Sequence, residues 1–181
     1  MVRPNINSTK IHVGNRLAAM LVDHFAMCMV MVIFYVPFMS KLFREFDNTR
    51  NVQEFYSDAG YAYYIALFGF SLYFCKDCIN GRSIAKRIIP LQLVNYKTGA
   101  IADPVRCVIR NLLCVIWPIE VIVVLNNPNR RIGDFIAGTK LVPYYPASEP
   151  SNLNYLQIVV SIILAYIISL LFSFGLEYII S

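Results

Sequence analysis

The chain has 181 residues, of which 57% are hydrophobic and 15% are charged, and its mean hydropathy is +0.55. A soluble enzyme needs a more polar surface than this composition provides, so the composition excludes that class and predicts a lipid environment. The net charge of +5 would suggest nucleic acid as a partner of a soluble protein. Here the basic residues flank apolar runs, which favours the lipid bilayer and its anionic headgroups as partners, and no nucleic acid.

Three apolar runs are long enough to cross a bilayer, whose hydrocarbon core requires about 20 apolar residues per helix. They are residues 17–39, 61–75 with flanks, and 153–180, and a fourth run, 105–125, is interrupted by charges and a proline. The predicted fold is therefore an all-α membrane protein, a bundle of three to four transmembrane helices.

The first run begins just after Arg16 and carries Asp23 and His24. Arg16 and Asp23 are nearly two helical turns apart, so we expect both on one face of the helix. The run is too long for a signal peptide and lacks a small-residue cleavage site, which predicts a retained helix. We expect Arg16 to anchor the helix end by snorkelling, and His24 to pack against a neighbouring helix.

The distribution of lysine and arginine predicts the orientation, because both residues collect in cytoplasmic loops. The N-terminal segment carries Arg3, Lys10 and Arg16 without an acidic residue. It is therefore predicted to lie on the cytoplasmic side of the cell inner membrane. The basic loop over residues 76–103 belongs on the same side, and the charge-balanced segment 40–58 on the opposite side.

The loop after the second run contains apolar residues over 88–94, then Lys97-Thr98-Gly99, then residues 100–102. This pattern predicts a small cytoplasmic β-hairpin with Gly99 in the turn. Cys75 and Cys78 have a CxxC spacing, but no second pair or histidine lies near them in the sequence. We therefore expect these thiols to pack as small apolar groups, and we predict no metal site and no cofactor.

The run 105–125 contains Pro118, which breaks the helical hydrogen-bond ladder. About ten residues on each side rise only about 15 Å, half the hydrocarbon thickness. A re-entrant hairpin that turns near Trp117 and Pro118 fits this pattern and keeps the following basic loop cytoplasmic. A plain fourth span remains the alternative, and the two topologies differ in the side on which the C-terminus lies.

Charged residues within apolar runs define a candidate site. A carboxylate at membrane depth costs roughly 2.5 to 3.5 kcal/mol on insertion scales, so Asp23 requires a partner. We expect Arg106 and Arg110 to supply it, because their i, i+4 spacing places them on one helix face. Glu120 is a second carboxylate for the same interior. Such a network either fixes how the helices meet or forms a proton or cation site, and both interpretations stay open.

Several motifs resemble those of the RDD family of small prokaryotic membrane proteins, in the same order along the chain. They are residues 16–19 (RLAA) with Asp23, residues 81–86 (GRSIAK), residues 91–94 (LQLV), Pro104 with Arg110, and residues 131–139 (RIGDFIAGT). Ser83 and Ala85 stand where the family has threonine and glycine. The resemblance implies that Arg16, Asp23 and Asp134 are the defining residues, and we expect Asp134 at the membrane surface beside Arg130 and Arg131.

The resemblance also suggests a division of the chain. Residues 1–142 form the RDD-like membrane domain, 143–152 a proline-containing connector, and 153–181 an additional C-terminal transmembrane helix. In that helix Ser161, Ser169, Ser173 and Gly175 provide small residues for close contact with a partner helix.

Members of the family are suspected of transport, some as sodium and proton antiporters, which implies transport of a small ion or solute by cation/proton exchange. The alternative is a non-catalytic subunit or adaptor of a larger membrane protein complex, either a homo-oligomer or one with a partner membrane protein. No enzyme is expected, because the P-loop, HExxH and GxSxG motifs are missing. The candidate intramembrane charge network consists of Arg16, Asp23, Arg106, Arg110, Glu120 and Asp134.

Overall fold

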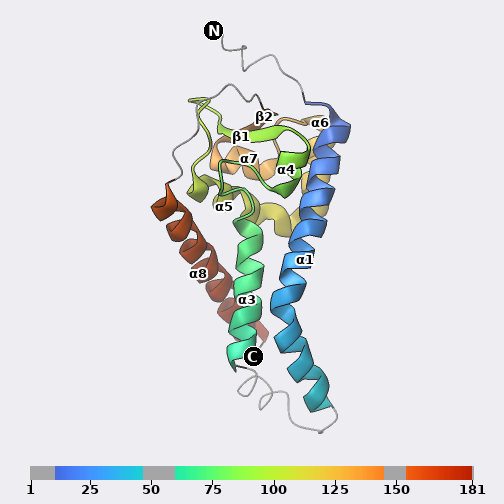
Figure 1. Ribbon diagram of the computed structural model, residues 1–181, viewed down its shortest axis with the longest axis vertical. Coiled ribbons are helices and arrows are strands. Elements are labelled where there is room, and N and C mark those ends of the chain that lie inside the picture. The colour runs from blue at the N-terminus through green and yellow to red at the C-terminus, as the bar shows by residue number, and fades with distance from the viewer. Residues whose placement is uncertain (1–10, 47–59, 145–153, 181) are drawn as a thin grey trace.

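The computed structural model describes residues 11–46, 60–144 and 154–180, and it is mostly helical. Three long helices run side by side from one end of the molecule (Figure 1): α1 (Val13–Phe46), α3 (Gly60–Phe74) and α8 (Tyr155–Ile180). Shorter elements gather at the end where α1 begins. They are α4 (Ile84–Ile88), β1 (Leu91–Asn95), α5 (Pro104–Leu112), a 3-10 helix (Leu113–Ile116), α6 (Trp117–Asn126), α7 (Ile132–Ala137) and β2 (Thr139–Pro143). We call residues 75–144 the head.

Two of the described helices, α1 and α8, are long and apolar enough to cross a membrane. Their outward side chains are large and apolar, with Ile33 70% and Leu171 67% exposed, as suits helices that face lipid rather than water. Three full spans were predicted, but α3 has 15 residues, a rise of about 22 Å that is less than the hydrocarbon thickness. The described part of the chain therefore contains two candidate spans.

Close contacts hold α3 against both of its neighbours. A Cβ built on Gly69 of α3 would collide with Cβ of Phe34 in α1, so the glycine lets the two helices approach closely. At the far end of α3 the Tyr63 hydroxyl contacts the Ser173 hydroxyl of α8. Ser161 and Ser169 are buried as well. Three of the small residues expected to meet a partner helix are therefore used within the chain itself.

The two strands of the head pair in antiparallel fashion, with Leu93 opposite Leu141 and both side chains fully buried. A hairpin with residues 100–102 was predicted instead. That hairpin is reduced to one bridge, Val94 to Ile101, around a turn in which Gly99 has φ +70°. Residues 100–102 can pair with β1 only briefly, because the chain enters α5 at Pro104. The main partner of β1 is therefore β2, much further along the chain.

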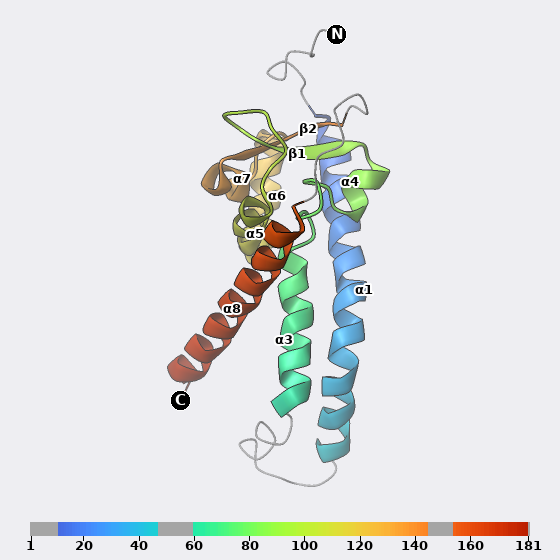
Figure 2. The same cartoon turned by 60° about the vertical axis from the view of Figure 1, so that its left-hand side comes forward.

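The third apolar segment is broken into α5, the 3-10 helix and α6. The break ends where α6 begins at Trp117, and Pro118 occupies the first turn of that helix, where a missing amide hydrogen is tolerated. Because β1 precedes this segment and β2 follows it, their pairing means that the segment returns to the end from which it started (Figure 2). Most of the predicted connector, 143–152, lies outside the described residues.

Candidate functional site: a buried charge cluster

Four carboxylates and four cations are buried together where the head meets the start of α1. Each of the eight side chains belongs to a residue that is at most 3% exposed. We call this group the charge cluster, and its members are Arg16, Asp23, Asp77, Lys86, Arg110, Glu120, Arg131 and Asp134. Buried charges require partners, so the pairing pattern shows how the cluster is built.

Asp134, in the first turn of α7, binds two arginines from other helices. One carboxylate oxygen accepts a hydrogen bond from Nη2 of Arg16 at 3.1 Å, and the other accepts one from Nε of Arg110. The Thr139 hydroxyl donates at 2.9 Å. Burial alone would raise the pKa of Asp134, but Arg110 and Arg16 hold this pKa well below its usual range. Asp134 is thus ionised and ties α7 to α1 and α5.

This geometry corrects two predictions. Arg16 was expected to snorkel at the interface, but it is 1% exposed and bound to Asp134. Asp134 was expected at the surface beside Arg130 and Arg131; it is buried, and Arg131 reaches it through the backbone N–H at 3.0 Å rather than through the guanidinium. The reason is that α7 folds inward over α5, which sequence spacing alone does not reveal.

Asp77, in the turn after α3, is a cluster member that the sequence analysis missed. It accepts a hydrogen bond from Nη1 of Arg110 at 2.6 Å and pairs with Nζ of Lys86 at 2.8 Å. Burial alone would raise the pKa of Asp77. The opposing effect of Lys86 and Arg110 is larger, so the pKa of Asp77 lies well below its usual range. Asp77 lies outside the apolar runs, so no lipid-exposure argument singled it out.

Asp23 of α1 is bound by α4 and not by the third segment. It accepts hydrogen bonds from the Ser83 hydroxyl at 2.7 Å, from Nζ of Lys86 at 2.8 Å and from the backbone N–H of Ala85 at 3.1 Å. The predicted ion pairs with Arg106 and Arg110 are therefore wrong. The partners of Asp23 all belong to the GRSIAK motif, residues 81–86, and its lysine is the sequence signal for this ion pair.

Glu120 of α6 pairs with Nη1 of Arg131 at 2.9 Å and accepts a hydrogen bond from the backbone N–H of Gly133 at 3.2 Å. Arg106, by contrast, is not part of the cluster. Its side chain is 41% exposed, pairs with Asp103 at 3.3 Å and donates to the Ala137 carbonyl at 3.0 Å. Five of the six predicted site residues thus come together, and Arg106 instead covers the C-terminal end of α7.

Polar groups around the cluster have packing roles. Nδ1 of His24 lies 3.2 Å from the Tyr73 hydroxyl, which joins α1 to α3 as expected for a packing histidine.

The five cysteines, Cys75 and Cys78 among them, are free thiols. Among the described residues, no group of three or more His, Cys, Asp or Glu side chains is placed to hold a metal ion.

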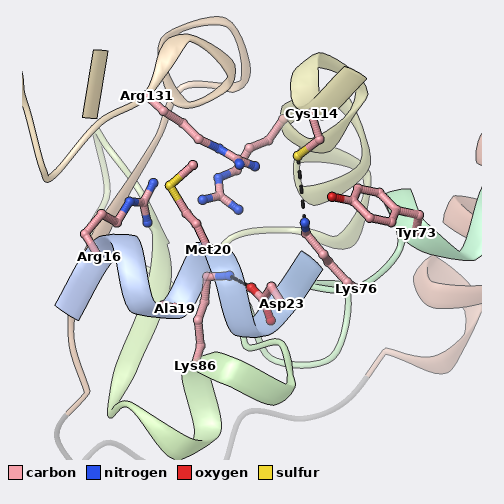
Figure 3. Close-up of a pocket in the computed structure, with 10 residues that line it drawn as sticks. Arg16, Ala19, Met20, Asp23, Tyr73, Lys76, Lys86, Cys114 and Arg131 are labelled. Carbon is pink, nitrogen blue, oxygen red and sulfur yellow. Dashed lines mark hydrogen bonds and ion pairs between the residues drawn. The ribbon is translucent and has the colours of Figure 1, made fainter. Parts of the chain in front are cut away.

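A small cavity of about 10 Å³, room for about one water molecule, opens within the cluster. Its lining comprises Arg16, Ala19, Met20, Asp23, Tyr73, Lys76, Lys86, Arg110, Cys114 and Arg131. Figure 3 shows the side chains of Arg16, Lys86 and Arg131 around Met20, whereas Lys76 lies beside Tyr73 and points to the sulfur of Cys114. The predicted placement of Arg16 and Asp23 on one helix face is confirmed, because both line this cavity.

Long apolar helices joined to a head with a buried charge cluster define a membrane protein. The family model for the RDD family matches residues 11–176, nearly the whole chain, and the chain belongs to that family. The match includes most of α8. No curated relative and no solved structure matches the chain.

Proposed function

We propose that this RDD family protein is a non-catalytic, non-transporting subunit of a membrane assembly, in which the charge cluster locks the head onto the start of α1. The observation that carries the proposal is that each of the cluster's four carboxylates is already bound by at least one cation of the chain. A cation-exchange site needs a carboxylate that a solute ion can occupy, and the paired acids of the cluster do not provide one.

The apolar helices below the cluster support the same proposal. Between His24 and Lys41, α1 carries no Asp, Glu, Lys, Arg or His residue, and neither does α3 over its whole length. Ions crossing hydrocarbon need polar or charged side chains along their path. Below the cluster, these stretches of α1 and α3 therefore offer an ion no carboxylate and no basic side chain.

The arrangement of the head supports a membrane topology for this subunit. We propose that α1, α3 and α8 cross the inner membrane and that α5 and α6 form a re-entrant pair. Although α3 is shorter than the hydrocarbon thickness, it starts beside the far part of α1, where Nζ of Lys41 lies over the Tyr61 ring, and it ends at the head. The pairing of β1 with β2 supports the re-entrant pair. The basic residues of the head then share one side with the N-terminus, which favours the cytoplasm.

The test is reconstitution of the purified chain into sealed vesicles with a proton-sensitive dye and an imposed sodium gradient. We expect no sodium-dependent proton movement from the chain alone. In a second arm, chemical crosslinking in native membranes is expected to give one stoichiometric complex, either with itself or with another membrane protein.

Cation/proton exchange is the second candidate, favoured by the cavity beside Asp23. Sodium-dependent proton flux that disappears in Asp23→Asn and persists in Asp103→Asn would establish exchange and overturn the subunit proposal. Asp103 is a matched control, because its carboxylate is 58% exposed and pairs only with Arg106 among the described residues.

A further inference from the structure

Lys76 is a fifth cation beside the charge cluster, and it differs from the other four in its partners. Its Nζ donates to Sγ of Cys114 at 3.8 Å and lies 4.3 Å from the centroid of the Tyr73 ring. Within the described ranges no carboxylate oxygen lies within ion-pair distance of it. Each cation of the charge cluster, in contrast, has such a carboxylate.

The lining of the cavity carries mostly positive charge. Five cations face it, and the one carboxylate in its lining, Asp23, is already bound by Lys86 and Ser83. Four cations and four carboxylates neutralise each other in the cluster, and the half-buried Lys76 adds one positive charge at the edge of the cavity. Low dielectric surroundings make such a charge unfavourable unless a counterion accompanies it.

Unused hydrogen-bond donors are the second observation. Nε of Arg16 and Nε of Arg131 are buried without a hydrogen-bond partner in the described structure, and both side chains line the cavity. Buried donors normally have acceptors, and an anion accepts bonds from charged donors most strongly. No group of the lining accepts a hydrogen bond from these two donors, and an anion in the cavity would supply the acceptor.

We propose that the cavity is a binding site for a monatomic anion of the halide class, held by Lys76 with the guanidinium groups of Arg16 and Arg131. The cavity volume of about 10 Å³ sets the size limit. That space suits a particle close to the size of water, whereas polyatomic anions such as sulfate or phosphate are too large. The bound anion completes the charge balance of the head, so the site goes beyond the proposed subunit function and does not depend on it.

The experiment measures the thermal unfolding of the purified chain in a mild detergent at constant ionic strength, while chloride or bromide replaces gluconate. We expect a saturable rise in unfolding temperature with chloride and bromide, because a ligand that binds only the folded state stabilises it. Sulfate should give no such rise. Lys76→Met should weaken the apparent halide affinity by at least about tenfold, and Lys97→Met, which changes an exposed lysine of the head, should leave it unchanged.

A second measurement needs no variant and therefore covers the case in which Lys76→Met fails to fold. Broadening of the chloride-35 resonance by the wild-type chain should be reversed by added bromide. Wild-type protein that gives no halide-specific stabilisation and no reversible broadening would overturn the proposal. Equal halide affinity in wild type and Lys76→Met would do the same, with Lys76 then held as a neutral amine. Neither readout involves flux or a partner, so failure here is distinct from failure of the proposed function.

Discussion

At the scale of single residues, arginine geometry explains how so many charges share one buried site. The planar guanidinium of Arg110 presents several donors in fixed directions, which lets it bind Asp134 through Nε and Asp77 through Nη1 at once. A lysine offers only one nitrogen, and Lys86 accordingly sits between Asp23 and Asp77 with 2.8 Å to each. These two bridging cations join Asp23, Asp77 and Asp134 into one connected network.

Asp134→Asn is predicted to destabilise the protein strongly. The change leaves Arg16 without its carboxylate partner and Arg110 with only Asp77, and breaking a buried pair by removing one partner costs about 3 to 5 kcal/mol. Unfolding followed by circular dichroism in mixed detergent would measure the loss. Asp103→Asn, at an exposed pair, should change stability by less than about 0.5 kcal/mol, and equal effects of the two variants would contradict the buried network.

Stability should fall only in strong acid. The pKa values of Asp77 and Asp134 lie below their usual range in the folded state, so these groups stabilise the fold at pH values above the unfolded-state value of about 3.9. This contribution is lost as the pH decreases from there through the lower folded-state values.

We therefore expect no loss of stability from these two groups between pH 7 and pH 5, and a steep decrease in unfolding temperature below about pH 4. Unfolding temperatures measured across this range in one detergent would show it. The assignment would be contradicted if stability increased as the pH falls from 7 to 5 and if this increase persisted after replacement of His12 and His24.

At the scale of elements, helix approach depends on a few small residues. Gly69 allows α1 and α3 to come close at Phe34, whereas a Cβ built on Gly175 in α8 would meet nothing within 4 Å. In the head, a Cβ at Gly133 would collide with the Arg110 carbonyl and lie 3.2 Å from Oε1 of Glu120. The contact between α7 and α5 therefore requires glycine there.

Gly69→Ala should loosen the pairing of α1 with α3. The added methyl group overlaps Phe34, and overpacking of this kind costs about 1 to 3 kcal/mol. The matched variant Gly175→Ala meets nothing within 4 Å and gains helix propensity, so its stability should be unchanged or up to about 1 kcal/mol higher. Unfolding in mixed detergent compares the two, and a Gly69→Ala protein as stable as wild type would show that the helices are not in close contact.

At the scale of the whole molecule, charge and hydrophobicity are separated along the long axis. The head and the start of α1 hold the buried charges, and α1, α3 and α8 extend from the head, with α8 inclined relative to α3 (Figure 2). The side chains that these helices turn outward include many large apolar ones. This separation fits a lipid environment around the apolar helices, with the charge cluster and the head near one membrane surface.

Single cysteines should reveal this topology through labelling by a membrane-impermeant maleimide. Lys97→Cys and Asn127→Cys, both exposed positions of the head, should be labelled from the same side, and Tyr178→Cys, 86% exposed near the end of α8, from the opposite side. Spheroplasts and inverted vesicles give the two sides, and wild-type protein gives the background from native thiols. Labelling of positions 97 and 127 from opposite sides would instead indicate a plain fourth span.

The sequence by itself determined the membrane environment, the helices α1 and α8, the break before Pro118 and five of the six charged residues that come together. These features follow from local composition, because apolar length, proline chemistry and a charge within an apolar run are properties of a short segment. The motif order was also sufficient to indicate the RDD family.

Tertiary structure alone decided which charges pair and which strand β1 joins. Asp23 binds Lys86, Asp134 binds Arg16 and Arg110, and β1 pairs with β2 across the whole broken segment. An ion pair between distant segments depends on how helices and loops close over one another, and several arginines and lysines were chemically equivalent candidates for each carboxylate. Only the packing of α4 and α7 against α1 and α5 distinguishes them.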